Sequence, residues 1–574
     1  MKLISLLLTI AICLTGSTVS AQTGYEITAD SILNHLKVLA SDSLEGREVG
    51  EPGEWKAAQY IKSIFETAGL EPKGDNGTYL QAFEFTKRIE FGPDNRLSLN
   101  SQEMSINDDY QPMNHSASMA FDFDEVVSVG YGIVTEDSTH NDYAGLDING
   151  KAVLISRYTP EPNNNDDSTI SDTTFDRYSG LVSKMVTAIN HGAAAVFFYT
   201  PISHDDTIIT IGVTHVKPKD IPVIFVRRRG LEKLRLDLTA PQLTSAKGVT
   251  DLNRVRGTGY NVIGYLQGAT DTVSIVGAHY DHLGWGTPTS RYHGAEKKIH
   301  YGADDNGSGT AAVLELARAF SSRQDELDES ILFIAFSGEE SGTLGSGHYV
   351  RNWTVDRSVA RMMINMDMIG RLADQDKGLA IMGTGTCPEF KEYLDQKDMG
   401  NLTVVFKESG SGPSDHAPFY HDSIPCLNFF TGAHEDYHTP NDVIEKIDLN
   451  GVVTVARLVA DILWHFTAYD GPLTFHRTKD KSASGGPSNL TVKFGIMPDF
   501  ITEHNGLGIN GVSTDQPADQ AGILKGDIII KMDERHVGDI YDYMNALKKY
   551  RKGDSCDVTL VRGTDTLTVL VEFK

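Results

Sequence analysis

AHYDHLG, from Ala278 to Gly284, comes directly after the apolar run VSIVG and decides how this chain folds. An apolar run of this kind is typical of a buried strand, and open α/β sheets bind ligands at the carboxyl ends of their strands. The runs ILFIAFSGEE and MMINMD repeat the arrangement farther along the chain, each with an acidic residue soon after the apolar stretch. The sequence therefore predicts a buried, largely parallel sheet with polar side chains gathered at one edge.

The polar side chains at these strand ends, and in the loops between them, are of the types that bind zinc. They offer imidazole nitrogens and carboxylate oxygens from separate loops, and the candidates are His279, Asp305, Glu340, Asp367 and His438. Structural zinc sites usually close on four ligands and often include Cys, so this set predicts a catalytic metal centre. Charge favours two ions, because three carboxylates and one hydroxide balance the four positive charges of two zinc ions.

Further residues of the same loops have other predicted roles. Asp281 follows His279 too closely to bind the same metal from a strand end, and it is suited to orienting the His279 ring. Glu339 and Glu340 are adjacent, so their side chains diverge, and one can bind metal while the other accepts a proton from water. The remaining histidines of this region are interpreted as surface or pocket-wall residues: His282, His300, His416 and His434.

A calcium-binding loop is the alternative for the segment GADDNGSGTAAVLE. Asp304 and Glu315 fall at the first and last ligand positions of such a loop. No predicted helix precedes Asp304, and Ala311 stands where these loops have a larger apolar anchor. The pattern therefore favours the zinc interpretation.

Residues 1–21, MKLISLLLTIAICLTGSTVSA, have the pattern of a cleaved signal peptide: a basic residue, a short apolar core and small residues before the cut. We expect export to the periplasm or the extracellular space, and no membrane attachment after cleavage, since the apolar run is too short to span a bilayer. The net charge of −27 argues against a nucleic-acid or anionic-membrane partner. An odd number of cysteines remains after cleavage, which does not indicate a disulfide framework: Cys387, Cys426 and Cys556.

The chain is too long for one ordinary domain, and its pattern changes several times. Strands alternate with helices over residues 250–475, which together with residues 22–120 predict an α/β domain with a mixed, largely parallel sheet flanked by helices. Residues 121–249 contain short β-type runs and no cluster of metal-ligand types, and they are predicted to be a β-rich insertion. Residues 476–489 form a polar linker, and residues 490–574 a small unit with short strands and one helix.

Six motifs in order resemble the co-catalytic dizinc aminopeptidase family, within the glutamate carboxypeptidase and transferrin-receptor superfamily: HYDHLG, GADDNGSG, FSGEE, NMDMIG, SDHAPF and YHTPND. The resemblance covers the amino-terminal helices, with LEGREVG, and residues 259–470. It implies two zinc ions, one held by His279 and Asp367, the other by Glu340 and His438, with Asp305 as the bridge. It also implies that Glu339 is the general base, that Tyr437 stabilises the oxyanion, and that the peptide bond after Asp305 is cis.

Two other segments resemble accessory domains of proteases. NDYAGLDINGKAVLISR and INHGAAAVFFYT resemble a protease-associated domain, which places one at residues 121–249. GLGINGVSTDQPADQAGILKGDIIIKMD resembles the PDZ domain of bacterial secreted proteases. In that family the loop GLGI, here Gly506–Ile509, binds a peptide carboxylate, so a peptide carboxyl terminus is an expected partner of residues 490–574. This sequence departs from the pattern by having Asn505 and Gly506 where a basic residue would help.

These resemblances imply a secreted zinc-dependent exopeptidase acting on peptides, with an aminopeptidase as the preferred interpretation. Three alternatives stay open: a carboxypeptidase or dipeptidase on the same scaffold, a glutaminyl cyclase, and a non-catalytic receptor-like binding protein. The complete ligand set and Glu339 argue against the receptor. The cyclase branch tends to bind one zinc ion and would not need the insertion or the carboxyl-terminal unit.

Overall fold

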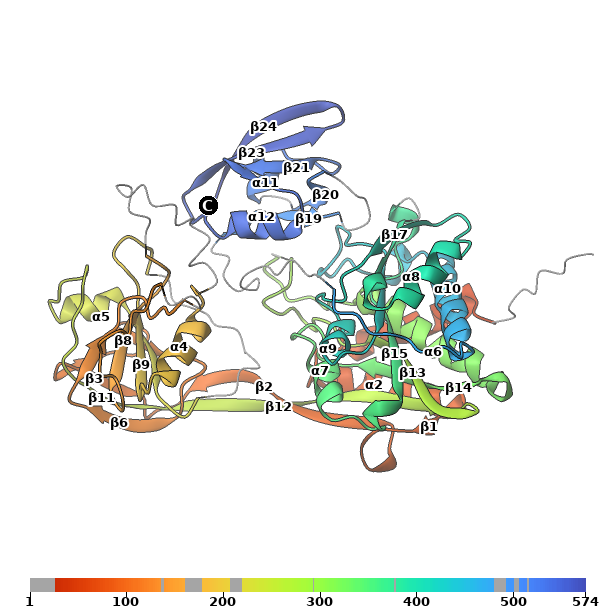
Figure 1. The fold of residues 1–574 in the computed structure, drawn as a ribbon, viewed down its shortest axis with the longest axis horizontal. Helices are drawn as coiled ribbons and strands as arrows, with labels where there is room; N and C mark the ends of the chain where they lie inside the picture. The colour runs from red at the N-terminus through yellow and green to blue at the C-terminus, as the bar shows by residue number, and fades with distance from the viewer. Residues whose placement is uncertain are drawn as a thin grey trace, which may run out of the picture.

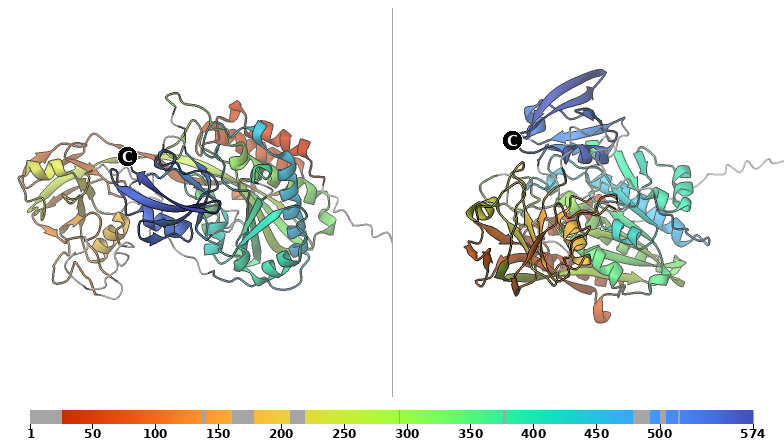
Figure 2. Two further views of the ribbon diagram at one scale, coloured as in Figure 1. Left: turned by 90° about the horizontal axis from the view of Figure 1, so that it is seen from above. Right: turned by 60° about the vertical axis from the view of Figure 1, so that its left-hand side comes forward.

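The computed structural model describes residues 26–135, 139–160, 178–206, 219–292, 294–375, 378–478, 492–499, 505–513 and 516–573. The predicted signal peptide, residues 1–21, and most of the predicted linker, residues 476–489, lie outside the described residues. Figure 1 shows an α/β domain, a β-rich insert beside it, and a small carboxyl-terminal domain, hereafter the tail, above and between the two. The views of Figure 2 agree with this arrangement.

The α/β domain is built on a mixed sheet in which the strands lie in the order β1-β12-β14-β13-β15-β18-β16-β17, with β2 beside β12. Their bounds are β1 Glu71–Pro72, β2 Leu80–Phe91, β12 Leu252–Leu266, β13 Thr270–His279, β14 Glu329–Phe336, β15 Ala360–Met366, β16 Gly378–Met382, β17 Thr403–Lys407 and β18 Cys426–Phe430. β13 runs parallel to β14 and to β15, and β15 runs parallel to β18. Most residues of β13, β14 and β15 are buried on both faces, which explains their continuous apolar sequences.

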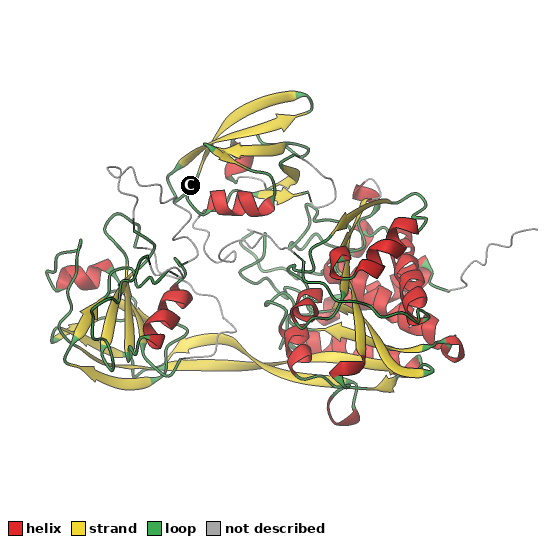
Figure 3. Ribbon diagram, in the orientation of Figure 1, coloured by secondary structure: helices red, strands yellow, loops and turns green. Residues whose placement is uncertain are grey.

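Helices cover both faces of this sheet (Figure 3). One face carries α1 Ala29–Leu39, α2 Pro52–Thr67, α6 Gly309–Ser321, α8 Pro388–Gln396 and α10 Leu449–Thr467. The other carries α7 Leu344–Arg351 and α9 His416–His421. In the described part of the chain, α10 is the one helix long and apolar enough to cross a membrane, and most of it is buried in the core. The cysteines Cys387, Cys426 and Cys556 are buried, and none of these three forms a disulfide bond.

The insert consists of two sheets that share a core. The first has the order β5-β10-β9-β8-β7 and the second the order β4-β3-β11-β6. Their bounds are β3 Arg96–Leu99, β4 Gln102–Met104, β5 Tyr110–Pro112, β6 Met119–Phe123, β7 Val126–Ser128, β8 Ala152–Ser156, β9 Ala195–Tyr199, β10 Val223–Val226 and β11 Ala246–Thr250, with helices α4 Leu181–Asn190 and α5 Arg228–Lys233. The antiparallel pair β2 and β12 continues from the α/β domain into the insert and carries it at its far end (Figure 1).

The tail has its own core and the strand order β19-β20-β21-β23-β24, with β22 beside β21. Its elements are β19 Ile496–Pro498, β20 Leu507–Val512, β21 Ile528–Met532, β22 Arg535–His536, β23 Ser555–Arg562, β24 Asp565–Glu572, α11 Pro517–Gln520 and α12 Ile540–Leu547. The tail also contacts the insert, because Arg551 hydrogen-bonds His204 and lies 5.7 Å from the centre of the Tyr158 ring.

The strand order of the tail bears on where a peptide could add a strand to its sheet. A bound peptide adds a strand to a free sheet edge. β20, which contains most of Gly506–Ile509, is paired with β19 on one side and with β21 on the other. Within the described residues, β19 and β24 are the two edge strands, and β19 is the one beside β20. The backbone of β20 is therefore already paired, whereas β19 has a free edge within the described residues.

Candidate metal centre

The carboxyl ends of three adjacent strands bring the predicted residues together. His279 is the last residue of β13, Asp367 directly follows β15, and Glu339 and Glu340 follow β14 after a short loop. Because these strands run parallel, their ends meet at one edge of the sheet. Asp305 lies in the turn η3 (Ala303–Ser308), which leads into α6, and its peptide bond to the next residue is cis, which confirms that expectation.

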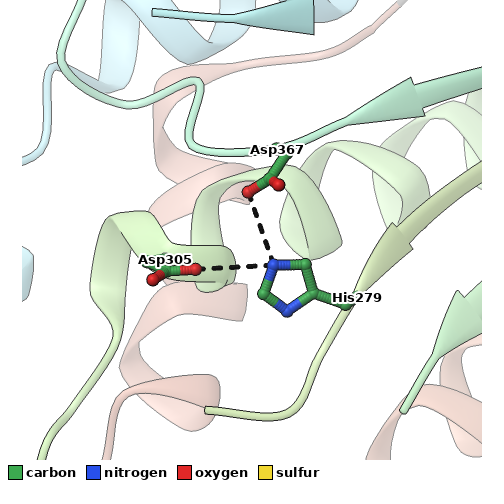
Figure 4. A group of neighbouring side chains, drawn as sticks. All are labelled: His279, Asp305 and Asp367. Atoms are coloured by element: carbon green, nitrogen blue, oxygen red, sulfur yellow. Dashed lines mark hydrogen bonds and ion pairs between the residues drawn. The ribbon is translucent and has the colours of Figure 1, made fainter. Parts of the chain in front are cut away.

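His279, Asp305 and Asp367 form the first cluster (Figure 4). The Nε2 atom of His279 lies 3.4 Å from Oδ1 of Asp305 and 3.4 Å from Oδ1 of Asp367. Both distances exceed that of a typical hydrogen bond. They match the separation of about 3.4 Å between two atoms that each lie about 2.0–2.1 Å from one tetrahedral zinc ion. The first cluster therefore has the spacing of metal ligands.

Glu340 and His438 form the second cluster, on the other side of Asp305. The Nε2 atom of His438 lies 3.3 Å from Oδ2 of Asp305 and 3.0 Å from Oε2 of Glu340. Asp305 thus turns one carboxylate oxygen to each cluster. This is the arrangement of a carboxylate that bridges two cations.

His282 belongs to the second cluster, so its interpretation as a surface or pocket-wall residue is wrong. Its Nδ1 atom lies 2.7 Å from Oε1 of Glu340 and 3.6 Å from Oδ2 of Asp305. The shorter distance is that of a hydrogen bond, and the side chain of His282 is completely buried. His282 therefore orients Glu340, while the other oxygen of that carboxylate faces His438. The letters HYDH carry a signal for this role, since they place two imidazoles three residues apart after a buried strand.

The residues of the alternative calcium loop do not share a site. Asp304 lies 3.2 Å from Nε2 of His434, behind the two clusters, whereas Glu315 on α6 lies 3.1 Å from Nε2 of His35. These separate partners exclude the calcium-loop geometry. His300 makes its own contact, at 2.7 Å, with the hydroxyl of Ser290.

The buried carboxylates in and beside the centre, among them Asp415 just before α9, have pKa values shifted in different directions. Burial raises the pKa of Asp305 to about 6 and that of Asp415 to about 7, and it raises the pKa of Glu339 well above its ordinary value. Burial opposes protonation of His438, but the charges and hydrogen bonds of Glu340 and Asp305 outweigh it and raise its pKa to about 11. Burial also opposes ionisation of Glu340 and Asp367, but His438 and His279 outweigh it and lower the pKa of these two acids. In the acids with a raised pKa, no such partner among the described residues outweighs burial, and two divalent cations would supply the missing positive charge.

Asp281 connects the His279 ligand to the turn that carries Glu339 and Glu340. Its backbone carbonyl oxygen lies 3.2 Å from Nδ1 of His279. Its carboxylate accepts hydrogen bonds from the backbone N–H of Glu339 at 3.1 Å and of Glu340 at 3.4 Å. Asp281 thus occupies the place that an orienting residue requires.

Tyr437 lies beside the second cluster. Its ring stacks on that of His438, with centroids 3.8 Å apart and planes 24° from parallel. Burial and the negative charges of Asp305 and Glu340 raise the pKa of Tyr437 well above its ordinary value, so its hydroxyl stays protonated. A protonated phenol in this position can donate a hydrogen bond to an oxygen atom that gains negative charge.

Asp442 supports the bridging residue and was not found from the sequence. Its carboxylate accepts hydrogen bonds from the backbone N–H of Asp304 at 2.9 Å and of Asp305 at 3.0 Å. Nη2 of Arg371 lies 3.4 Å from the same carboxylate. Asp442 belongs to the motif YHTPND, but its contact with Asp305 spans 137 residues of sequence and has no local pattern.

Known proteins have sequences similar to the region that contains the two clusters. Residues 261–463 match the model of Peptidase family M28, and residues 495–573 match that of the PDZ domain. Aminopeptidase YwaD of Bacillus subtilis (strain 168) is 36% identical over 158 residues, which are 25% of this chain and 33% of that protein. A probable leucine aminopeptidase of Arthroderma otae is 26% identical over 211 residues, 35% of this chain and 55% of that protein. The chain thus matches about half or less of the length of these curated relatives.

Solved structures similar to this one include an aminopeptidase from Aneurinibacillus sp. strain AM-1, with 24% identity over 79% of this chain and 97% of that chain and a TM-score of 0.45. BSAP, a zinc aminopeptidase from Bacillus subtilis, has 23% identity over 80% of this chain and 98% of that chain and a TM-score of 0.41. By the two family models, residues 261–463 are similar to peptidase family M28 and residues 495–573 are similar to the PDZ domain.

Proposed function

We propose that this chain is a dizinc aminopeptidase that removes amino-terminal residues from peptides. One observation carries the proposal: Asp305 turns one carboxylate oxygen to His279 and the other to His438, so that two cation sites share one ligand. The match to peptidase family M28, and relatives named as aminopeptidases, support the same activity.

The donor atoms fit zinc, because imidazoles and carboxylates without Cys are typical of catalytic zinc sites. In this proposal one ion is held by His279 and Asp367, the other by Glu340 and His438, and both by Asp305. When bound, zinc supplies Lewis-acid polarisation of the scissile carbonyl group and lowers the pKa of water.

Three residues of the chain perform the remaining steps. Glu339 takes a proton from the attacking water onto its carboxylate and passes it to the nitrogen of the leaving amine. Its Oε2 atom lies 4.0 Å from Nε2 of His279, close to the first cluster but outside both ligand sets. Tyr437 donates its hydroxyl hydrogen to the substrate carbonyl oxygen as negative charge develops there. Asp281 holds the His279 ring and the turn of Glu339 in place.

Leucine is the proposed first choice of amino-terminal residue, since similar proteins include probable leucine aminopeptidases. The test uses one leucine-leading peptide in three forms: free, acetylated at the amine, and amidated at the carboxyl end. An aminopeptidase releases leucine from the free and amidated forms but not from the acetylated one. Cleavage of the acetylated form together with loss of the amidated one would overturn the proposal in favour of a carboxypeptidase.

Two further substrates distinguish an aminopeptidase from a dipeptidase, a glutaminyl cyclase and a receptor-like protein. A dipeptidase cleaves Leu-Gly but not a longer leucine-leading peptide. A glutaminyl cyclase converts a glutamine-leading peptide into a product that has lost ammonia while its peptide bonds stay intact. A receptor-like protein with two bound zinc ions leaves every peptide unchanged.

Export is part of the proposal and is supported by the signal-peptide pattern of residues 1–21. In a Gram-negative host the full chain should appear in the periplasmic fraction with Gln22 as its first residue. Amino-terminal sequencing or intact mass measures this. A cytoplasmic protein that still begins at Met1 would refute export.

We also propose that the insert is a protease-associated domain and that the tail binds peptide carboxyl termini along β19. The motifs within residues 121–249 and the two-sheet architecture support the first assignment. The PDZ match and the edge position of β19 support the second. Titration of the full chain with peptides that end in a free or an amidated carboxyl group tests it, because a PDZ domain should bind the free form more tightly.

A further inference from the structure

The tail contacts the catalytic loop that carries Tyr437 and His438. The contact is made by Arg291, which lies in the long loop between β13 and η3. Its guanidinium group donates to the hydroxyl of Ser513 in the tail at 2.8 Å and lies 3.2 Å from the sulfur atom of Met497 on β19. The same group donates to the backbone carbonyl of Tyr437 at 3.2 Å. One side chain therefore joins the tail to the turn that carries the proposed oxyanion donor.

The backbone around Arg291 holds the other residue of that turn. The N–H of Arg291 donates to the carbonyl oxygen of His438 at 2.9 Å. Nδ1 of His438 lies 3.2 Å from the carbonyl oxygen of Thr289, which leaves Nε2 directed at the second cluster. His438 has a φ of 58°, a left-handed conformation that is unfavourable for a residue with a side chain and persists only when its surroundings hold it. Thr289 and Arg291 provide those surroundings.

A second contact between the tail and this region supports the first. The side-chain amide of Asn510, on β20, donates to the backbone carbonyl of Ala433 at 2.6 Å. Ala433 lies shortly before Tyr437 in the same loop. The tail thus reaches the loop at two points, once directly and once through Arg291.

We propose that Arg291 is a positioning residue through which the PDZ domain sets the geometry of the Tyr437–His438 turn. The inference rests on the proposed function, because it assigns catalytic work to that turn. Among the described residues, the Arg291 guanidinium group contacts Tyr437, Ser513 and Met497 and no side chain of either cluster, and it acts by fixing the carbonyl group of Tyr437. The PDZ domain is accordingly part of the catalytic apparatus, even though it contributes none of the proposed ligands.

The test uses full-length variants with matched controls. Ser513→Ala removes the tail's hydroxyl acceptor and leaves the catalytic domain unaltered, and Ser555→Ala at an exposed position of β23 is its control. Arg291→Ala removes the connecting side chain, and Arg88→Ala, on the exposed part of β2, is its control. Kinetics on the leucine-leading peptide are measured for all four variants, with zinc content determined on the same samples.

The expected kinetic result is a fall in kcat with KM nearly unchanged, because the contact aligns groups that act in the transition state. Ser513→Ala should lower kcat about threefold, because Arg291 keeps its contacts with Tyr437 and Met497, and Arg291→Ala should lower it about tenfold or more. The two control variants should match the unmodified protein. A change in KM alone, or no change in Arg291→Ala, would overturn the proposal.

Hydrogen exchange gives a readout that does not require activity. In the folded chain the N–H of Tyr437 donates to the carbonyl of His434, and that of Thr439 donates to Asp436. Ser513→Ala and Arg291→Ala should accelerate exchange of these two amides about threefold or more, without a change at β13 or β15. Faster exchange in a protein that cleaves no peptide would refute the proposed function and leave the coupling intact. Unchanged exchange together with normal cleavage would refute the coupling alone.

Discussion

The two clusters of the metal centre share Asp305 but are held in different ways. His279 ends a strand that is paired on both sides, and Asp367 directly follows another strand and donates its backbone N–H to Phe429 at 3.0 Å. His438 instead lies in a loop, in a left-handed conformation, and depends on the loop of Thr289 and Arg291. The first cluster is therefore fixed by the core of the sheet, whereas the second is fixed by contacts between loops. The second is the one that other parts of the molecule can influence.

Glu339→Gln should have the largest effect and separates chemistry from metal binding. Glu339 lies next to the first cluster and belongs to neither ligand set, so its loss should lower kcat about 10²–10⁴-fold while zinc content stays the same. Steady-state kinetics and metal analysis on one sample measure both quantities. Glu435→Gln, an exposed residue of the same loop as Tyr437, is the control. Loss of zinc in proportion to activity would make Glu339 a ligand.

Asp305→Asn and His438→Ala test whether one residue serves both clusters. Asp305→Asn should weaken both zinc sites, and His438→Ala chiefly one, each by more than the about 10–100-fold that loss of an orienting residue costs. Equilibrium dialysis against zinc, with two binding constants fitted, distinguishes the variants. If Asp305→Asn retains two tightly bound zinc ions, the bridge is misassigned.

His282→Ala and Asp281→Asn form a matched pair, one for each cluster. His282 orients Glu340, so its loss should weaken the second zinc site about 10–100-fold and leave the first unchanged. Asp281 lies beside His279, so Asp281→Asn should act mainly on the first site. The same dialysis measures both. If both variants weaken both zinc sites equally, the two clusters are not oriented by separate residues, and the proposed difference between them is wrong.

Glu315→Gln should have the smallest effect and concerns a region without proposed metal ligands. Burial opposes ionisation of Glu315, but hydrogen bonds from His35, Arg318 and Ser31 outweigh it and lower its pKa from 4.5 to about 2. A pKa lowered by folding adds stability above about pH 4.5, and this is lost as the pH falls toward about 2. Between about pH 4.5 and about pH 2, the free energy of unfolding should fall by about 1–2 kcal/mol more in the unmodified chain than in Glu315→Gln, with solvent screening allowed for.

Urea unfolding of zinc-free protein at several pH values measures that difference. Zinc-free protein is the proper sample, because protonation of the metal ligands would otherwise add its own loss of stability. If the free energy of unfolding depends on pH in the same way in both proteins, the contacts of Glu315 with His35, Arg318 and Ser31 do not lower its pKa.

The strand ends and the gathering of the proposed ligands were predictable from the sequence. Each proposed ligand either lies at the end of an apolar run or belongs to a short motif. His282 was misjudged although HYDH places it three residues after His279, because that spacing does not show that its ring turns to Glu340. The pairing of β20 with β19 was not predicted either, because β19 is only three residues long, too short to recognise. The roles of Asp442 and Arg291 depend on contacts between distant segments, which no local pattern encodes.

The pair β2 and β12 that carries the insert has a mechanical consequence. Twelve residues of β2 in extended conformation make an arm about 40 Å long, and the pairing is irregular between Val255 and Arg256. Residues 88–91 of β2 lie beyond the irregularity, a length of about 14 Å, so a bend of about 5° there displaces the end of the arm by about 1 Å. Arg551 of the tail contacts His204 and Tyr158 of the insert. A displacement of the insert therefore also displaces or strains the tail. The α/β domain, the arm, the insert and the tail are thus connected in a ring, since the tail contacts both the insert and the α/β domain. A movement of any one of the four parts strains its contacts with the next.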